Sequence, residues 1–166
     1  TAKESIGTET VPFITIAGGG AAGVSIDGVV DTMVINSTAD AHIKGKKSIT
    51  EENVTKDYGV KAGNNVTVAS TGEVTLRSVG GAAGGGGVGG VGATVHTVVI
   101  DKDTVSESEN TIVEGANITS TATETDNFFT TLVSAAGGGT AGVAGAVNTN
   151  VITSDVKTGF KNSTLK

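Results

Sequence analysis

The chain has 166 residues, and Gly and Thr, at 26 each, together with Val, at 23, dominate its composition. Its formal charge is −6, Arg77 is its only arginine and it has no cysteine. These features argue against a nucleic-acid partner, which requires clustered Lys and Arg, and against a fold that rests on disulfides or thiolate-bound metal. No run of about 18 or more apolar residues is present, so we expect no membrane-spanning segment.

Three runs rich in Gly and Ala recur along the chain, at residues 18–24, 84–93 and 137–146. An apolar strand is expected before each run, at 11–16, 74–79 and 128–133. After each run a second strand ends in Ile35, Ile100 or Ile152, which are 65 and 52 residues apart. Such recurrence is typical of units that bury their apolar faces by stacking on one another. We therefore expect repeat units at about 11–73, 74–127 and 128–166, the last one truncated.

The strands themselves predict an all-β fold, because Thr and Val are β-branched and apolar residues recur at every second position. We predict a parallel β-helix (β-solenoid) with about three coils of roughly 20 residues in each unit. The Gly/Ala-rich runs are expected where a coil turns sharply or where neighbouring coils pack closely. The residues expected to point inward are Ile14, Ile16, Val66, Val68, Val74, Leu76, Val98, Ile100, Ile118, Val133 and Val151.

Two polar segments, Lys44–Asp57 and Asp101–Glu114, are predicted to be variable loops, and any binding specificity is expected there. Within the first, residues 50–57 form a candidate short helix that Thr50 would cap. Turn positions with a left-handed backbone are expected among Asn64, Asn65, Asp101 and Asp103.

No motif in the chain predicts an enzyme. Residues 87–92 match the glycine pattern of dinucleotide-binding loops, but a strand follows them instead of the required helix. Asp101 and Asp103 alone do not make a calcium site. His42 and His96 lack a partner at metal-ligand spacing and are expected at the surface or at strand edges. We therefore predict no catalytic, cofactor-binding or metal-binding residues, and the sequence does not identify binding residues.

The run Gly137–Ile152, GGGTAGVAGAVNTNVI, and the strand 63–69, GNNVTVA, resemble the repeats of large filamentous-haemagglutinin and leukotoxin-type adhesins of Gram-negative bacteria. The resemblance extends over nearly the whole chain. It implies that residues 1–166 are one fragment of a longer repeat protein that is exported by two-partner (type V) secretion and folds as a right-handed β-helix. The implied location is extracellular or at the bacterial cell surface.

The function that this resemblance implies is that of a stalk or host-cell-binding module. Its partners would be a host-cell surface protein or glycan and the neighbouring repeats of the same chain. Two alternatives remain: a purely structural fibre or biofilm module without a specific ligand, and a fragment of a β-helical polysaccharide-degrading enzyme.

Overall fold

The computed structural model describes residues 1–166 except 8–11, 46–47, 52–53 and 58, and for 4–7, 48–49, 51 and 54–57 it describes the backbone alone. In this part of the chain every regular element is a β-strand, which confirms the predicted all-β class. The strands are paired in parallel, apart from one short antiparallel hairpin.

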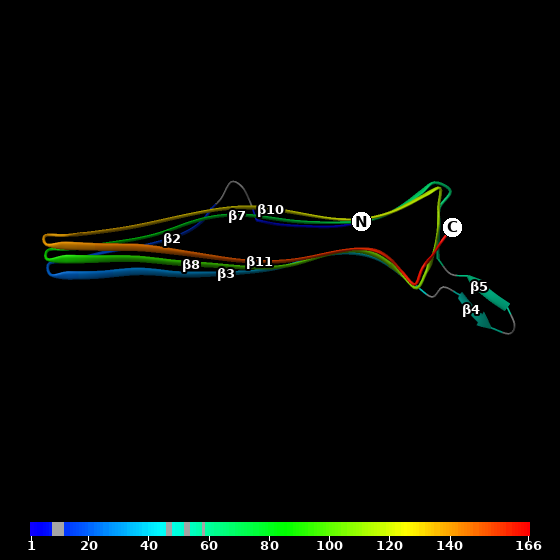
Figure 1. The fold of residues 1–166 in the computed structure, drawn as a ribbon, viewed down its shortest axis with the longest axis horizontal. Helices are drawn as coiled ribbons and strands as arrows, with labels where there is room; N and C mark the ends of the chain where they lie inside the picture. Colours follow the sequence, from blue (N-terminus) through cyan, green and yellow to red (C-terminus); the bar gives the residue numbers. More distant parts are fainter. Residues whose placement is uncertain (8–11, 46–47, 52–53, 58) are drawn as a thin grey trace.

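The chain runs through the same three sheets in the same order three times, and we call each pass a circuit. The second circuit consists of β7 (Asn65–Gly86), β8 (Gly89–Glu109) and the short β9 (Ile112–Glu114). The remaining strands are β1 (Ala2–Gly7), β2 (Phe13–Ala21), β3 (Val24–Lys44) and β6 (Gly59–Lys61) in the first circuit, and β10 (Asn117–Gly138), β11 (Ala141–Lys161) and β12 (Thr164–Leu165) in the third. The long strands form a slender body with three tight turns side by side at one end (Figure 1).

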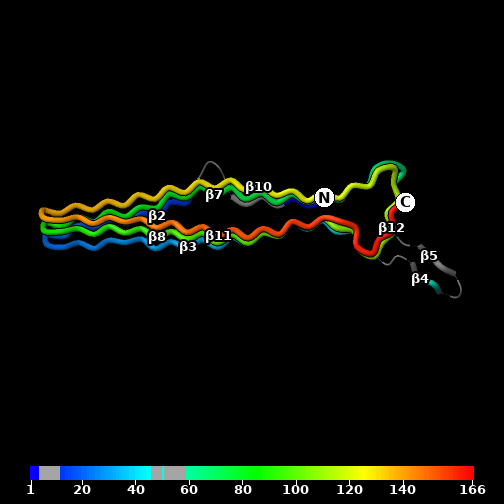
Figure 2. Tube along the Cα trace, in the orientation of Figure 1, coloured from blue at the N-terminus to red at the C-terminus, as the bar shows by residue number. Residues whose placement is uncertain are grey.

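The second circuit lies between the other two. β7 pairs with β1 and β2 on one side and with β10 on the other, while β8 lies between β3 and β11 (Figure 2). Asn65 is opposite Asn117 and Gly89 is opposite Ala141, so the second and third circuits are offset by 52 residues in both long sheets. The expectation of three short coils per unit is therefore wrong. Because β7 has 22 residues and β8 has 21, one circuit takes up the whole length of a repeat.

The first circuit is longer than the second because it carries an insertion. Lys44 is opposite Glu109, and Gly59 is opposite Ile112, so residues 45–58 stand where the second circuit has only residues 110 and 111. The insertion contains an antiparallel pair, β4 (Ser48–Glu51) and β5 (Val54–Asp57), placed in Figure 1 at the end away from the tight turns. The helix expected at 50–57 is therefore wrong. The β-branched residues Ile49, Thr50, Val54 and Thr55 favour strands over a helix.

The second polar segment is not a loop either. Residues 101–109 continue β8, and 112–114 form β9. The left-handed turn positions among the described residues other than glycine are Asn110 and Asn162, with φ of 52° and 47°, whereas Asn65, Asp101 and Asp103 lie in strands. Asn110 and Asn162 were not among the predicted turn positions, although each is an asparagine that directly follows a long strand.

The core lies between the two long sheets. Val74, Leu76, Val98 and Ile100 form its centre, and Met33, Ile35 and Phe128 pack against it from the neighbouring circuits. Val66 and Val68 are also buried, as predicted. Ile118 is half-buried opposite Val66.

Four residues predicted to point inward lie on the outer faces instead. Ile14 and Ile16 are 57% and 73% exposed, and Val133 and Val151 are 59% and 48% exposed. Their partners in the central circuit, such as Val79 and Val99, occupy the outward positions of alternating strands. These strands carry apolar residues on both faces, so a period of two cannot show which face is buried.

The Gly-rich runs lie at the tight turns, where the two long sheets come into direct contact. A Cβ on Gly84 would lie 2.2 Å from the Val91 carbonyl oxygen, and one on Gly92 would lie 2.2 Å from that of Ala135. Only glycine fits these inward positions, which confirms the expectation that the runs mark a sharp turn and close packing.

Candidate functional site

The most enzyme-like arrangement is a chain of hydrogen bonds through Ser78, His96 and Asp31. Ser78 on β7 and His96 on β8 face each other between the sheets, with 3.1 Å between Ser78 Oγ and His96 Nε2. Asp31 on β3 is opposite His96 in the sheet register, and its Oδ2 lies 2.9 Å from His96 Nδ1. Serine, histidine and aspartate follow one another in the same order as in the catalytic triad of serine hydrolases.

A substrate cannot reach this chain of hydrogen bonds. Ser78 and His96 are both 0% exposed, and the Asp31 side chain is only 10% exposed. A nucleophilic serine needs space for the carbonyl it attacks and donors for the developing oxyanion. Here the hydroxyl is enclosed by the two sheets. The arrangement is suited to satisfying three buried polar groups and to tying β3, β7 and β8 together.

The expected surface position of His96 is therefore wrong, whereas His42 does lie on the outer face. His42 is paired with Asp40 on its own strand, and its Nε2 lies 3.4 Å from Glu107 on β8. His96 could have been assigned to the interior from the sequence, since it lies two residues before Val98 and four before Ile100 on one strand face.

A second buried polar group is Lys102, which occupies an inward position of β8 and is 1% exposed. Its Nζ lies 2.8 Å from Glu124 Oε1 and also donates to Asp126, both on β10. Burial lowers the pKa of Lys102, but the hydrogen bonds and charges of Asp126 and Glu124 outweigh this effect, so that its pKa is raised. The lysine is therefore held as a cation and does not serve as a neutral nucleophile.

The position opposite Glu124 in β7 is Gly72. A Cβ there would lie 2.6 Å from Thr104 Oγ1, so this part of the interior is already full. Ser154 of the third circuit donates a further hydrogen bond to Glu124. The carboxylates of Glu124 and Asp126 are thus committed to holding the second and third circuits together.

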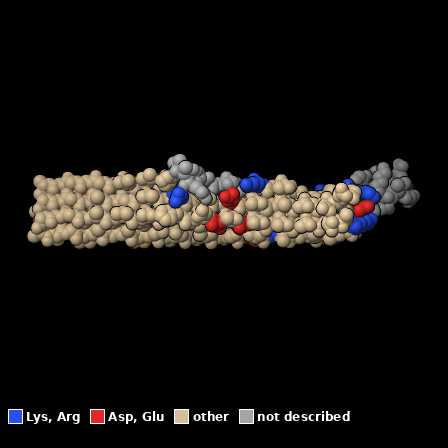
Figure 3. Space-filling model, turned by 90° about the horizontal axis from the view of Figure 1, so that it is seen from above, with Lys and Arg blue, Asp and Glu red and all other residues tan. Residues whose placement is uncertain are grey.

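Several of the outward charges pair across circuits. Lys44 and Lys161 lie 3.5 Å and 3.8 Å from opposite oxygens of Glu109, and Lys61 lies 2.8 Å from Glu114. In Figure 3 the charged side chains gather in the middle and near the end with the short strands. Among the described residues no group of three or more His, Asp or Glu is arranged to hold a metal ion.

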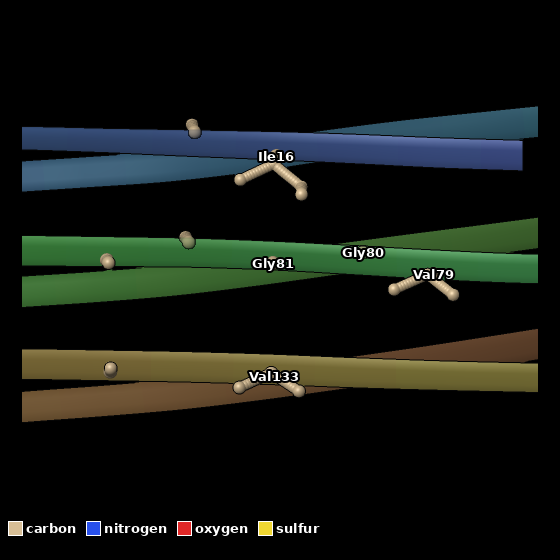
Figure 4. A pocket seen from close by; sticks show the side chains of 9 residues that line it. Ile16, Val79, Gly80, Gly81 and Val133 are labelled. Carbon is tan, nitrogen blue, oxygen red and sulfur yellow. The ribbon is translucent and has the colours of Figure 1, made fainter.

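A shallow apolar depression of about 300 Å³ lies on the outer face of β7. Gly81 is opposite Ile16 on one side and Val133 on the other, so its missing side chain leaves a gap between them (Figure 4). Val79 and the backbone of Gly80 complete the wall. The depression is open and contains no catalytic group.

Comparisons with models of protein families, with curated proteins and with solved structures find no match. In the part of the chain that the structure describes, no helix is long and apolar enough to cross a membrane.

Proposed function

We propose that the chain is a right-handed parallel β-solenoid that serves as a non-enzymatic segment of a secreted or surface-exposed bacterial adhesin. The observation that carries this proposal is the uniform register of the circuits. The second and third circuits keep one offset, 52 residues, along the full length of both long sheets. Circuits in such a register can follow one another along a fibre, and each contacts only its neighbours. The resemblance to adhesin repeats supports the same function.

The buried polar groups favour a structural role over an enzymatic one. The Ser78 hydroxyl is enclosed and hydrogen-bonded to His96, and Lys102 is paired with two carboxylates. An esterase or glycosidase activity that disappears in Ser78→Ala, with the fold intact by circular dichroism, would contradict the proposal.

Host-cell contact is assigned in this proposal to the insertion at residues 45–58, where the first circuit departs from the period of the others. The second circuit supplies a natural replacement, because Asn110 and Thr111 connect the same two strand positions. Replacing 45–58 by Asn-Thr should therefore remove the insertion and leave the register intact.

The experiment measures attachment of the intact chain and of this variant to host cells at low and at physiological salt. If the intact chain attaches saturably and the variant does not attach, the segment is a binding module. Attachment that the variant keeps places recognition on the regular faces of the circuits. If the intact chain does not attach, the adhesin-binding role is overturned for this segment and the purely structural fibre remains.

A further inference from the structure

The outer face of the sheet formed by β3, β8 and β11 carries large apolar side chains, which are exposed on β3 and β11 and half-buried on β8. They form columns across the three circuits, because the strands are in register. The β3 members Ile26, Val30 and Val34 are 78%, 80% and 62% exposed. The columns are Ile26–Val91–Val143, Val30–Val95–Val147 and Val34–Val99–Val151, and we call this surface the valine face.

The columns alternate in size along the strands. Between the first two lies a column of small residues, Gly28–Ala93–Gly145, and a threonine column, Thr32–Thr97–Thr149, separates the last two. The small column is a groove that runs across the sheet between two ridges of branched side chains.

The valine face is also free of charge. The two acidic residues of this part of β3, Asp27 and Asp31, occupy inward positions, and Asp31 is bonded to His96. The first outward carboxylate of β8 is Asp101, beyond the last column.

The size of the face is that of an interaction surface. Three strands about 4.8 Å apart and ten residues at about 3.3 Å each give a footprint of roughly 33 by 14 Å. A contiguous apolar patch of this extent is within the range of the largest patch on a typical monomer, and such a patch is often functional.

We propose that the valine face packs against the valine face of a second copy of this chain. The pattern of large and small columns selects one arrangement. A twofold axis along the stack, between the Gly28 and Val30 columns, makes the facing strands antiparallel and places β8 opposite β8. The small column of each copy then receives the Val30–Val95–Val147 ridge of the other, so the contact is made twice. A twofold axis along the strands would set ridge against ridge and leave the grooves empty.

The remaining columns are also compatible with this arrangement. The Ile26 column faces the Thr32 column, and Asp101 faces the tight turn of the other copy at the solvent-exposed rim. The footprint, roughly 460 Å² per copy, is smaller than the about 800 Å² per partner of a standard specific interface, so the expected product is a weak and reversible dimer.

The test is sedimentation velocity over a wide concentration range on three proteins. The intact chain is expected to pass from monomer to dimer and to stop there. Val95→Lys, in the centre of the face, should weaken the dimer by at least roughly tenfold, because burying an unpaired ammonium in an apolar contact is costly. Val105→Lys is the matched control: Val105 is also an outward valine of β8, but it lies opposite Asp40 and Lys157 in the charged half, and this variant should dimerise like the intact chain.

A fourth protein, Ala93→Leu, distinguishes an interlocking contact between the columns from nonspecific hydrophobic association. Leucine adds apolar area but fills the groove, so interlocking predicts a weaker dimer and nonspecific association predicts a stronger one. Circular dichroism checks that each variant keeps its strand content.

Several results would overturn the proposal. These are an intact chain that stays monomeric, a loss of dimer in Val105→Lys equal to that in Val95→Lys, tighter association of Ala93→Leu, or open-ended polymers that Val95→Lys leaves unchanged. A monomer that floats with phosphatidylcholine vesicles, and no longer floats as Val95→Lys, would instead assign the face to a lipid surface.

Discussion

The buried polar groups in the interior of this protein include three residues at inward positions of β8. His96, Lys102 and Ser106 alternate with outward residues on one strand, and all three are fully or almost fully buried. Each has a partner in a neighbouring circuit: Asp31 for His96, Glu124 and Asp126 for Lys102, and Ser120 for Ser106. A histidine and a lysine in an Asn- and Thr-rich chain resemble surface residues in the sequence. Both lie on the strand face of Val98 and Ile100, which were predicted to point inward, so this pattern indicates their burial. Only the register shows which residues are their partners.

Replacing Lys102 by methionine should destabilise the fold by about 3 kcal/mol, because Glu124 and Asp126 would keep their charges without the buried cation. Urea unfolding followed by circular dichroism measures the loss. The triple variant with Glu124→Gln and Asp126→Asn should recover part of it, since the uncompensated charges are removed. Equal stability of Lys102→Met and the unmodified chain would show that the ion pairs contribute nothing to the free energy of unfolding.

The same lysine predicts a pH dependence. Its pKa in the fold is raised above the ordinary 10.5, since the carboxylates of Asp126 and Glu124 outweigh the effect of burial. The stabilisation is therefore fully present below pH 10.5 and is lost as the pH rises through the folded-state pKa. The free energy of unfolding should fall more steeply above pH 10.5 in the unmodified chain than in Lys102→Met. Parallel curves for the two proteins would contradict this assignment.

At the scale of elements, the sequence predicts strands well and their faces poorly. Thr and Val identify the strands, and the Gly-rich runs identify the tight turns between the long strands. The inward positions of β7 and β8 near these turns are Gly, Ala, Ser and Thr, while the large Val and Ile side chains point outward. Usual hydrophobic patterning assigns the larger residues to the interior. Where two sheets touch through glycine, the larger residues point outward instead. This is why the prediction placed Ile16 and Val133 on the wrong face.

The contact between the sheets can be tested with two glycine substitutions. Gly92→Ala should cost about 3 kcal/mol or more, because the new Cβ would lie 2.2 Å from a backbone oxygen that cannot move without breaking the sheet. Gly18→Ala adds the same methyl group at an outward position, where the nearest atom is 3.7 Å away, and should leave the stability nearly unchanged. The measurement is the urea midpoint of each variant. A similar midpoint for both would mean that the sheets do not approach as closely as described.

At the scale of the whole molecule, the repeat spacing carried more information than any motif. The anchor isoleucines Ile35, Ile100 and Ile152 are opposite one another in the sheet, so their separations of 65 and 52 residues equal the offsets between circuits. What the spacing could not give is the number of coils in a repeat. That depends on strand length, and Asp101 and Asp103, which were read as turn residues, lie inside the 21-residue strand β8.

Because each circuit contacts only its neighbours, the protein should tolerate the loss of a whole circuit at a cost that depends on which partners remain. Two shortened chains test this: residues 1–116, which keep the first and second circuits, and residues 1–64 joined directly to 117–166, which keep the first and third. In the second chain the register brings Glu4 and Glu124, both opposite Gly72 in the full protein, into neighbouring positions without Lys102.

Both shortened chains should fold into parallel sheets with lower urea midpoints than the full chain. The chain 1–116 should be the more stable of the two, because it keeps the His96–Asp31 and Lys44–Glu109 pairs. In that chain Lys102 loses its carboxylates but gains solvent at the new open edge, whereas the other chain brings two acidic positions together. Equal midpoints would show that stability depends only on the number of circuits. A lower midpoint for 1–116 would show that the third circuit's carboxylates matter more than the contacts between the first two circuits.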